Sequence, residues 1–417
     1  MKRILLSITS VVLSLMTMAQ TDIPRPEYPR PQFERQEWVN LNGEWTYELD
    51  LSNTGLGRKF DKSQGFDKKI LVPFCPESEL SGVGYKDFIP GIWYQRKVQI
   101  PSAWEGKRIF MNFGAVDYYA TLYVNDKVAG RHWGGSSSFA IDITDYIESG
   151  KEANIVLWVK DDLRGGAQTG GKQSHGYYSS GCYYTRVTGI WQTVWMEAVS
   201  PVGLRNAYVK PDFDNSRFVV EPNFYALEKG LKLRIKVLDG TKVVASATET
   251  ATVPMTVVLP VKNVKTWSPE SPFLYDLEYE VLNAQNHVVD KVKSYAGMRK
   301  VHIEGNRVFL NNRPLYLRMV LDQGFYPKGV WTAPTDADLK GDIERAMAVG
   351  FNSARLHQKV FEERFHYWAD KLGYLTWGEA ASWGMDINGT AAARNFITEW
   401  AEVVERDRNH PSIITWT

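Results

Sequence analysis

The sequence predicts a multidomain protein in which two β-rich units precede a unit of alternating strands and helices. Three observations carry this prediction. Short alternating strands punctuated by glycine and proline fill residues 21–200, and a smaller unit of the same style fills residues 201–298. From residue 299 to 417, strand-like and helix-like segments alternate. At roughly 100–200 residues per domain, two to four domains are expected for 417 residues.

The first β unit is expected to be an all-β sandwich or a jelly roll. Residues 96–100 and 120–124 alternate in polarity, and the second run leads into Asn125-Asp126, a turn pair. Residues 155–159 form a denser apolar strand. Short strands at regular spacing, without helical periodicity, are typical of these two architectures.

The second β unit is smaller. Residues 231–237 follow a strict period of two and lead into Asp239-Gly240, a hairpin pair. Residues 277–281 alternate again. About one hundred residues of this pattern suit an immunoglobulin-like β-sandwich.

The last unit favours a parallel sheet, open or closed. The strands are expected at 315–319, 353–356, 374–377 and 413–416, and the helices at 336–349, 361–372 and 391–408. Thr335 is expected to cap the first helix and Gly373 to close the second. The third helix carries an apolar stripe formed by Phe396, Trp400, Val403 and Val404.

The N-terminus is expected to be a signal peptide over residues 1–20. Lys2 and Arg3 precede an apolar run at 4–18, and small residues stand before Gln20. The alternative is a membrane anchor, which needs about 20 apolar residues. We therefore expect export to the periplasm or outside the cell, and no membrane association after cleavage.

Charge and cysteine content exclude several classes of partner. The 49 basic and 48 acidic residues leave no basic field, so nucleic acid is not expected as a partner. Cys75 and Cys182 are expected to be two buried free thiols, with a disulfide as the alternative. No cysteine and histidine cluster has zinc spacing, and no glycine-rich segment has phosphate-loop context, so neither metal nor cofactor is expected.

Several short motifs in order carry a resemblance to a known family. The motifs are residues 41–45 (LNGEW), 72–74 (VPF), 92–94 (IWY), 113–117 (FGAVD), 189–192 (GIWQ), 267–272 (WSPESP) and 409–414 (NHPSII). Together they resemble glycoside hydrolase family 2. The resemblance implies a jelly-roll sugar-binding domain at 21–200, an immunoglobulin-like β-sandwich at 201–298, and the first half of a (β/α)8 TIM barrel at 299–417.

The resemblance also implies a chemistry. Retaining glycosidases need two carboxyl groups about 5–5.5 Å apart. In the family the acid/base glutamate follows the fourth barrel strand, so it is expected just after Thr417, and the nucleophile later still. No catalytic carboxylate is therefore expected within the 417 residues, which we expect to be inactive alone and poorly stable.

The candidate substrate-binding residues follow the first three strands of the last unit, where barrel sites lie. By resemblance, Arg355 and His357 lie near the sugar hydroxyls, with an arginine–carboxylate brace and a hydrogen-bonded histidine as the alternative. Glu379 is expected to orient Arg355 or to bind a hydroxyl. Trp383 is expected either to stack on a sugar or to pack in the core.

Two further candidates and one loop complete the set. Asp322 and Gln323 follow the first strand, where a sugar contact and loop bracing are equally open. Asp161, Lys172 and Gln173 stand in a glycine-rich loop that approaches the barrel in relatives, although a solvated loop is favoured here.

The function favoured by the resemblance is a retaining exo-β-glycosidase acting on a β-linked glycan. β-Galactosidase is the preferred specificity, with β-glucuronidase and β-mannosidase as alternatives. A non-catalytic carbohydrate-binding protein is the alternative from another class, because the β units are complete while the catalytic carboxylates are missing. The oligomeric state is not predicted.

Overall fold

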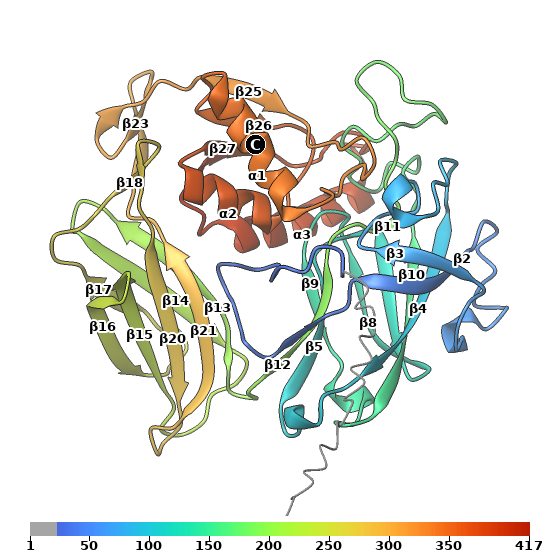
Figure 1. Ribbon diagram of the computed structural model, residues 1–417, viewed down its shortest axis with the longest axis horizontal. Coiled ribbons are helices and arrows are strands. Elements are labelled where there is room, and N and C mark those ends of the chain that lie inside the picture. The colour runs from blue at the N-terminus through green and yellow to red at the C-terminus, as the bar shows by residue number, and fades with distance from the viewer. Residues whose placement is uncertain (1–22) are drawn as a thin grey trace, which may run out of the picture.

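A computed structural model describes residues 23–417, and the predicted signal peptide at 1–20 lies outside them. Two β units stand side by side, and a unit of helices and parallel strands packs against both of them (Figure 1). None of the helices within residues 23–417 has the length and apolar character needed to cross a membrane.

The first β unit contains two antiparallel sheets and a short ladder. The first sheet contains β1 (Trp38–Asn40), β12 (Val194–Val199), β5 (Arg108–Phe113) and β9 (Phe139–Asp142). The second sheet contains β3 (Lys68–Val72), β2 (Gly43–Leu49), β4 (Gly91–Gln99), β10 (Glu152–Lys160), β7 (Tyr119–Val124) and β8 (Lys127–Trp133). The ladder pairs β6 (Val116–Asp117) with β11 (Gly189–Ile190). Alternate side chains of both sheets meet in one apolar core, as in a sandwich. The connections carry short 3-10 turns: η1 (Phe60–Lys62), η2 (Glu79–Ser81), η3 (Ser102–Trp104) and η4 (Thr144–Tyr146).

The second β unit is a smaller sandwich with its own core. Its strands are β13 (Leu204–Asp212), β14 (Arg217–Phe224) and β17 (Val257–Pro260) in one sheet; β16 (Lys242–Thr250), β15 (Lys232–Asp239), β20 (Tyr275–Leu282) and β21 (Val288–Ala296) in the other; and the ladder β18 (Trp267–Ser268) with β19 (Ser271–Pro272). The predicted hairpin is confirmed, because β15 and β16 pair across Gly240, whose φ of 61° favours glycine.

A three-stranded ladder leads into the last unit, where four parallel strands lie in chain order. The ladder is β22 (Val301–Glu304), β23 (Arg307–Leu310) and β24 (Arg313–Pro314), and the sheet is β25 (Met319–Asp322), β26 (Ser353–Leu356), β27 (Leu375–Gly378) and β28 (Ile413–Trp416). The helices between these strands are α1 (Asp336–Ala348), α2 (Glu363–Leu372) and α3 (Thr390–Asp407). The parallel sheet predicted from the alternation is confirmed.

Local signals set the ends of two helices as predicted. Thr335 and Asp338 form a capping box at the start of α1, each side chain binding the other residue's backbone N–H. Gly373 ends α2 in the left-handed region, with φ of 78°. Because these signals depend only on neighbouring residues, they could be read from the sequence.

The first strand of the sheet differs from its prediction. It begins at Met319 instead of Leu315, because the Leu315 amide still binds the Val308 carbonyl at 2.8 Å and extends the ladder. The side chain of Asn352 then holds the intervening chain, accepting from the Arg318 amide at 2.8 Å and donating to the Tyr316 carbonyl at 3.0 Å.

Of the apolar stripe predicted for α3, only Val403 lies on the buried face. The buried residues are Ala392, Asn395, Glu399, Val403 and Asp407. Phe396, Trp400 and Val404 are only partly buried and line an open hollow. The reason is that polar side chains of α3, such as Glu399, form the hydrogen bonds by which this helix packs on the first β unit.

The two cysteines are free, and one of them differs from its prediction. Cys75 is buried within the first β unit, whereas Cys182 is exposed. Cys182 lies in a loop, residues 174–184, that projects from the first β unit beside the last unit (Figure 1).

Candidate functional site

The candidate site lies where the first three parallel strands end. β26 ends at Leu356, so Arg355 and His357 flank its last residue, and Glu379 follows the end of β27. In the parallel register, Arg355 stands opposite Trp377 on the neighbouring strand. The carboxyl ends of parallel strands meet at one edge of a sheet, which brings these polar side chains together.

Glu379 is the centre of this cluster. Its buried carboxylate accepts from Arg355 Nε at 2.5 Å and from His357 Nδ1 at 2.6 Å. The amide and side chain of Gln358 add two further donors at 3.1 and 3.2 Å. A buried carboxylate needs such partners, because charge in a dry interior is otherwise costly.

The cluster leaves hydrogen-bonding groups directed elsewhere than Glu379: the Nη donors of Arg355 and the Nε2 acceptor of His357. Arg355 donates to the carboxylate through Nε alone, and its Nη groups make no hydrogen bond within residues 23–417. His357 is held through Nδ1, which assigns the proton there and leaves Nε2 without a protein partner in the same range. The carboxylate brace weighed as the alternative is therefore present, and it orients both residues.

Asp322 and Gln323 reach the same region from the end of β25. The Asp322 side chain accepts from the Gly324 amide at 2.9 Å, and burial raises the pKa of this carboxyl. The main-chain oxygen of Asp322 accepts from the His357 amide at 2.7 Å. Asp322 thus braces the loop, whereas Gln323 accepts from Lys172 Nζ at 2.6 Å.

The expectation of a solvated loop around Lys172 is wrong. Lys172 and Gln173 are both buried. The amides of Gly170 and Gly171 bind the carbonyls of Trp383 and Ala381 at 2.9 and 3.0 Å, so the loop is docked on the last unit. Gly171 has φ of 56°, and a Cβ there would lie 2.2 Å from the Gln358 carbonyl oxygen, so only glycine fits.

Trp383 lies at the rim of the cluster and is only partly buried. Its ring meets His357 edge to face, with centroids 5.4 Å apart, and lies 5.8 Å from the ring of Tyr183. Lys172 Nζ stands 5.5 Å from the same ring. Trp383 therefore belongs to the wall of the site and not to an apolar core.

Two residues at the site were not predicted. Gln358 adopts φ of 57°, a strained value for a non-glycine residue, and its side chain links Glu379 to the Trp383 amide. Lys359 is buried and donates to the carbonyls of Gly324 and Trp331. Burial lowers the pKa of Lys359 to about 8. Their only sequence signal is their place after a strand.

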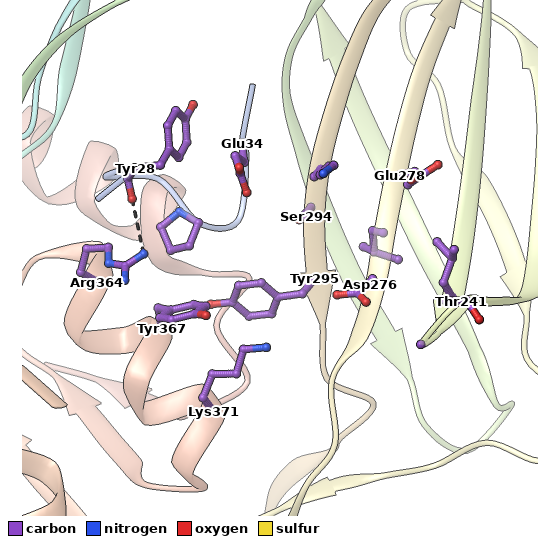
Figure 2. A pocket seen from close by; sticks show the side chains of 15 residues that line it. Tyr28, Glu34, Thr241, Asp276, Glu278, Ser294, Tyr295, Arg364, Tyr367 and Lys371 are labelled. Carbon is purple, nitrogen blue, oxygen red and sulfur yellow. Dashed lines mark hydrogen bonds between the residues drawn. The ribbon is translucent and has the colours of Figure 1, made fainter. Parts of the chain in front are cut away.

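A cavity of about 630 Å³ lies elsewhere, between the N-terminal segment, the second β unit and α2. Figure 2 shows that its walls carry side chains of both charges, with Lys371 and Arg364 near Tyr367 and with Glu278 and Asp276 across from them. Arg364 Nη1 donates to the Tyr28 carbonyl at 3.5 Å. Across residues 23–417, no group of three or more His, Cys, Asp or Glu is placed to hold a metal ion.

Comparison with known families identifies the class of protein. A family model described as "Glycosyl hydrolases family 2, sugar binding domain" matches residues 38–169, and one described as "Glycosyl hydrolases family 2" matches residues 203–299. The two matches together span more than half of the chain. The fold and these matches place the protein among the glycoside hydrolases. Within that class, the chain belongs to glycoside hydrolase family 2, which confirms the resemblance.

Individual relatives are distant but cover most of the chain. A β-glucuronidase of Paenibacillus borealis is 23% identical, across 92% of this chain and 67% of its own length. A β-galactosidase of Thermoanaerobacter pseudethanolicus is 25% identical, across 91% of this chain and 51% of its own length. A β-glucuronidase of Canis lupus familiaris is 24% identical, across 92% and 63%. The chain therefore spans about half to two thirds of the length of these relatives.

Solved structures agree on the fold. The β-glucuronidase from Ruminococcus gnavus in complex with D-glucuronic acid aligns with a TM-score of 0.79 at 20% identity, covering 94% of this chain and 68% of that one. The same enzyme with D-glucaro-1,5-lactone aligns with a TM-score of 0.81, also at 20% identity, covering 95% and 68%. At this identity the likeness concerns the fold alone.

Proposed function

We propose that this protein acts in the hydrolysis of β-linked glycosides, as a retaining exo-β-glycosidase. We also propose that the cluster of Arg355, His357 and Glu379 binds the sugar. The four parallel strands, on this proposal, are the first half of a (β/α)8 barrel, whose sites lie at the carboxyl ends of the strands. The single observation that carries the proposal is that Glu379 orients both Arg355 and His357 while leaving Nη and Nε2 atoms free for sugar hydroxyls.

The same geometry argues that Glu379 is not a catalytic acid or nucleophile. Both of its oxygens already accept hydrogen bonds, from Arg355 and from His357. A nucleophile needs a free oxygen aimed at the anomeric carbon, and a general acid needs a proton to give. Asp322 is also engaged, by the Gly324 amide. We therefore infer that the catalytic pair is not among these residues, and that the 417-residue chain by itself is inactive.

The choice of sugar rests on charge. The relatives named above include both a β-galactosidase and β-glucuronidases. β-Galactosidase was the preferred specificity from the sequence motifs. Lys172 and the free guanidinium end of Arg355 both stand at the site, while the Glu379 carboxylate is paired with Arg355 and the Asp322 carboxyl accepts from the Gly324 amide. A uronic carboxylate would be attracted by the Lys172 ammonium and by the free guanidinium end of Arg355, which favours β-glucuronidase as the second candidate specificity.

Binding to the 417-residue chain tests the proposal. Isothermal titration with glucuronic acid, galactose and mannose is expected to give measurable affinity for at least one sugar. Arg355→Ala is expected to weaken it about tenfold or more, because a hydrogen bond to a charged group contributes about 1.5–3 kcal/mol. His357→Ala is expected to weaken it about twofold to tenfold, because a neutral hydrogen bond contributes about 0.5–1.5 kcal/mol. Glu379→Gln should also weaken it, since the two donors lose their orientation.

Matched controls are available on the second β unit and the ladder. His287→Ala and Arg307→Ala change exposed residues of the same types and should leave the affinity unchanged. Equal affinity of the site variants and the unsubstituted chain would rule out the proposed sugar site. Hydrolysis of aryl β-galactosides or β-glucuronides by the purified chain, abolished by Glu379→Gln, would show instead that Glu379 is catalytic.

A non-catalytic carbohydrate-binding protein is the alternative from another class. The saturated carboxylate of Glu379 favours it, because the site as described binds without a free acid. It predicts sugar binding with no hydrolysis by the complete gene product. Turnover by the complete product would reject it.

We also propose that the protein is exported. The support is the basic start, apolar run and small residues of positions 1–20. N-terminal sequencing of the protein recovered from periplasm or medium is expected to begin at or next to Gln20. Recovery of the protein only in the cytoplasm, with Met1 retained, would contradict export.

A further inference from the structure

A loop of the first β unit, residues 174–184, lies beside the candidate site and is held by hydrogen bonds. We call this loop the tongue. At its base, the Ser174 amide binds the Tyr184 carbonyl, and the Tyr184 amide binds the Lys172 carbonyl, both at 2.8 Å. At its tip, Ser180 and Tyr183 exchange backbone hydrogen bonds at 3.0 and 3.2 Å. The hydroxyl of Ser174 also donates to the carbonyl of Tyr178 or of Gly176, both at 3.1 Å. These hydrogen bonds fix the backbone of the tongue, which projects beside the last unit (Figure 1).

The tongue exposes aromatic rings. Tyr178 is 79% exposed, Tyr177 is 50% exposed and Tyr183 is 37% exposed. The rings of Tyr177 and Tyr178 meet edge to face with centroids 4.7 Å apart. Leaving this much ring surface in water forgoes burial energy, and clustered exposed aromatics mark interaction sites.

A continuous series of ring contacts joins the tongue to the candidate site. His357 meets Trp383 at 5.4 Å, Trp383 meets Tyr183 at 5.8 Å, and Tyr183 meets His175 at 6.4 Å. His175 lies two residues from Tyr177. Ring contacts thus run from the residue proposed to bind a sugar hydroxyl to Tyr183 and His175 of the tongue, the loop that also carries the Tyr177–Tyr178 pair.

The position of the tongue relative to the site is fixed by direct contacts. The Gly170 and Gly171 amides dock on the carbonyls of Trp383 and Ala381, and Lys172 Nζ binds Gln323 Oε1 at 2.6 Å. These contacts tie the base of the tongue to the ends of β25 and β27. An object bound on the tongue is therefore held at a defined distance from Arg355 and His357.

We propose that the tongue is a binding subsite for the further sugar units of a β-linked oligosaccharide whose terminal unit occupies the candidate site. Tyrosine and tryptophan faces accept the C–H surface of a pyranose, and tyrosine hydroxyls exchange hydrogen bonds with sugar hydroxyls. A single sugar at the strand ends would leave the outer rings without a contact, so the outer rings assign a substrate with further units beyond the terminal one. The proposal rests on the proposed sugar-binding function and names its substrate class.

The test is the dependence of affinity on chain length. β-1,3- and β-1,4-linked galacto-oligosaccharides of one to four units, and the same lengths ending in glucuronic acid, are titrated into the 417-residue chain by calorimetry. Affinity is expected to rise about threefold to tenfold between one and three units in at least one series, the value of one aromatic contact. The double variant Tyr177→Ala with Tyr178→Ala should remove this rise and leave monosaccharide affinity unchanged.

The control is Tyr316→Ala, because Tyr316 is 78% exposed, as Tyr178 is, and lies before the first parallel strand, away from the strand ends. It should keep the full dependence on length, and Tyr178→Trp should keep it as well. Affinity independent of length in every series, or a rise that survives the double variant, would overturn the tongue proposal while monosaccharide binding stands. Equal weakening of all lengths would also overturn it. No binding of any sugar would reject the proposed function and this inference with it.

Discussion

Helices α2 and α3 each contact a β unit through a buried carboxyl group, the second unit from α2 and the first from α3, and the two carboxyl groups have different kinds of partner. On α2, Asp370 is paired with His410 Nδ1 at 2.6 Å and accepts from the Tyr295 hydroxyl of the second β unit at 2.8 Å. On α3, Glu399 accepts from Thr169 Oγ1 and the Ser136 amide of the first β unit, both at 2.8 Å. The α2 contact thus contains an imidazole that can carry charge, whereas the hydrogen-bond partners of Glu399 are neutral.

This difference changes how each contact responds to protonation. Burial raises the pKa of Glu399 to about 7, because neutral donors offset only part of the lost hydration. Burial disfavours a charged His410, but the adjacent Asp370 carboxylate outweighs it and raises the pKa of that imidazole. Both contacts therefore respond to pH, but through different groups: the carboxyl group itself on α3, and the imidazole beside the carboxylate on α2.

Removing the paired acid should have the largest effect. Asp370→Ala leaves His410, the Tyr295 hydroxyl and the Ser412 amide without their buried acceptor. We expect a loss of about 3–5 kcal/mol in the free energy of unfolding, the usual result of breaking a buried pair. Urea unfolding followed by tryptophan fluorescence measures it. Asp370→Asn keeps the shape and should cost less; a loss below about 1 kcal/mol for Asp370→Ala would break the comparison.

Glu399 should give the next largest effect, visible as a slope with pH. Its pKa is 4.5 as the ordinary value and about 7 when folded, so the folded protein holds an extra proton between these values. Stability is therefore expected to fall as pH rises from 4.5 through 7, by about 3 kcal/mol in all.

Glu399→Gln is expected to flatten this slope, because the amide cannot ionise. The contribution of His410 is present below pH 6.5 and is lost as pH rises through its raised pKa, but it is common to both proteins and cancels in their difference. Glu405→Gln, on an exposed position of α3, is the control and should keep the slope. Identical pH profiles for Glu399→Gln and the unsubstituted chain would show that Glu399 is charged when folded.

The smallest effect is expected at the edge of the same contact. Glu402 pairs with His132 Nε2 at 2.9 Å and accepts from Ser137 Oγ at 2.7 Å, but about a third of its side chain is exposed. Water and salt screen such a pair, so Glu402→Ala should cost at most about 1 kcal/mol. Thermal melts at low and high salt measure this. A loss as large as that of Asp370→Ala would mean that the rim, and not the buried acid, holds α3 in place.

Much of the fold could be predicted because its signals are local. Alternating residues such as 231–237 make strands whichever way they pack, and the Thr335–Asp338 capping box needs only four residues of chain. Gly373 ends α2 for the same reason. Arg355, His357 and Glu379 were predicted as one group, since parallel strands bring their carboxyl ends together.

The parts that could not be predicted depend on distant partners. Phe396 and Trp400 line an open hollow because Glu399 of α3 is the side chain that meets hydrogen-bond donors on the first β unit. The apolar periodicity of α3 does not reveal those donors. Gln358 and Lys359 acquire their roles only when Trp383 and Gly324 approach them.

By itself, the sequence determined the order of the three units, the alternation of their elements and the strand ends at which polar side chains gather. These depend on periodicity and on contacts between near neighbours. The tertiary structure alone decided that the loop at Gly171 docks on Gln358 and that the tongue's rings continue from Trp383. The reason is physical: whether a polar or aromatic side chain is buried, paired or left exposed depends on which distant surface supplies its partner.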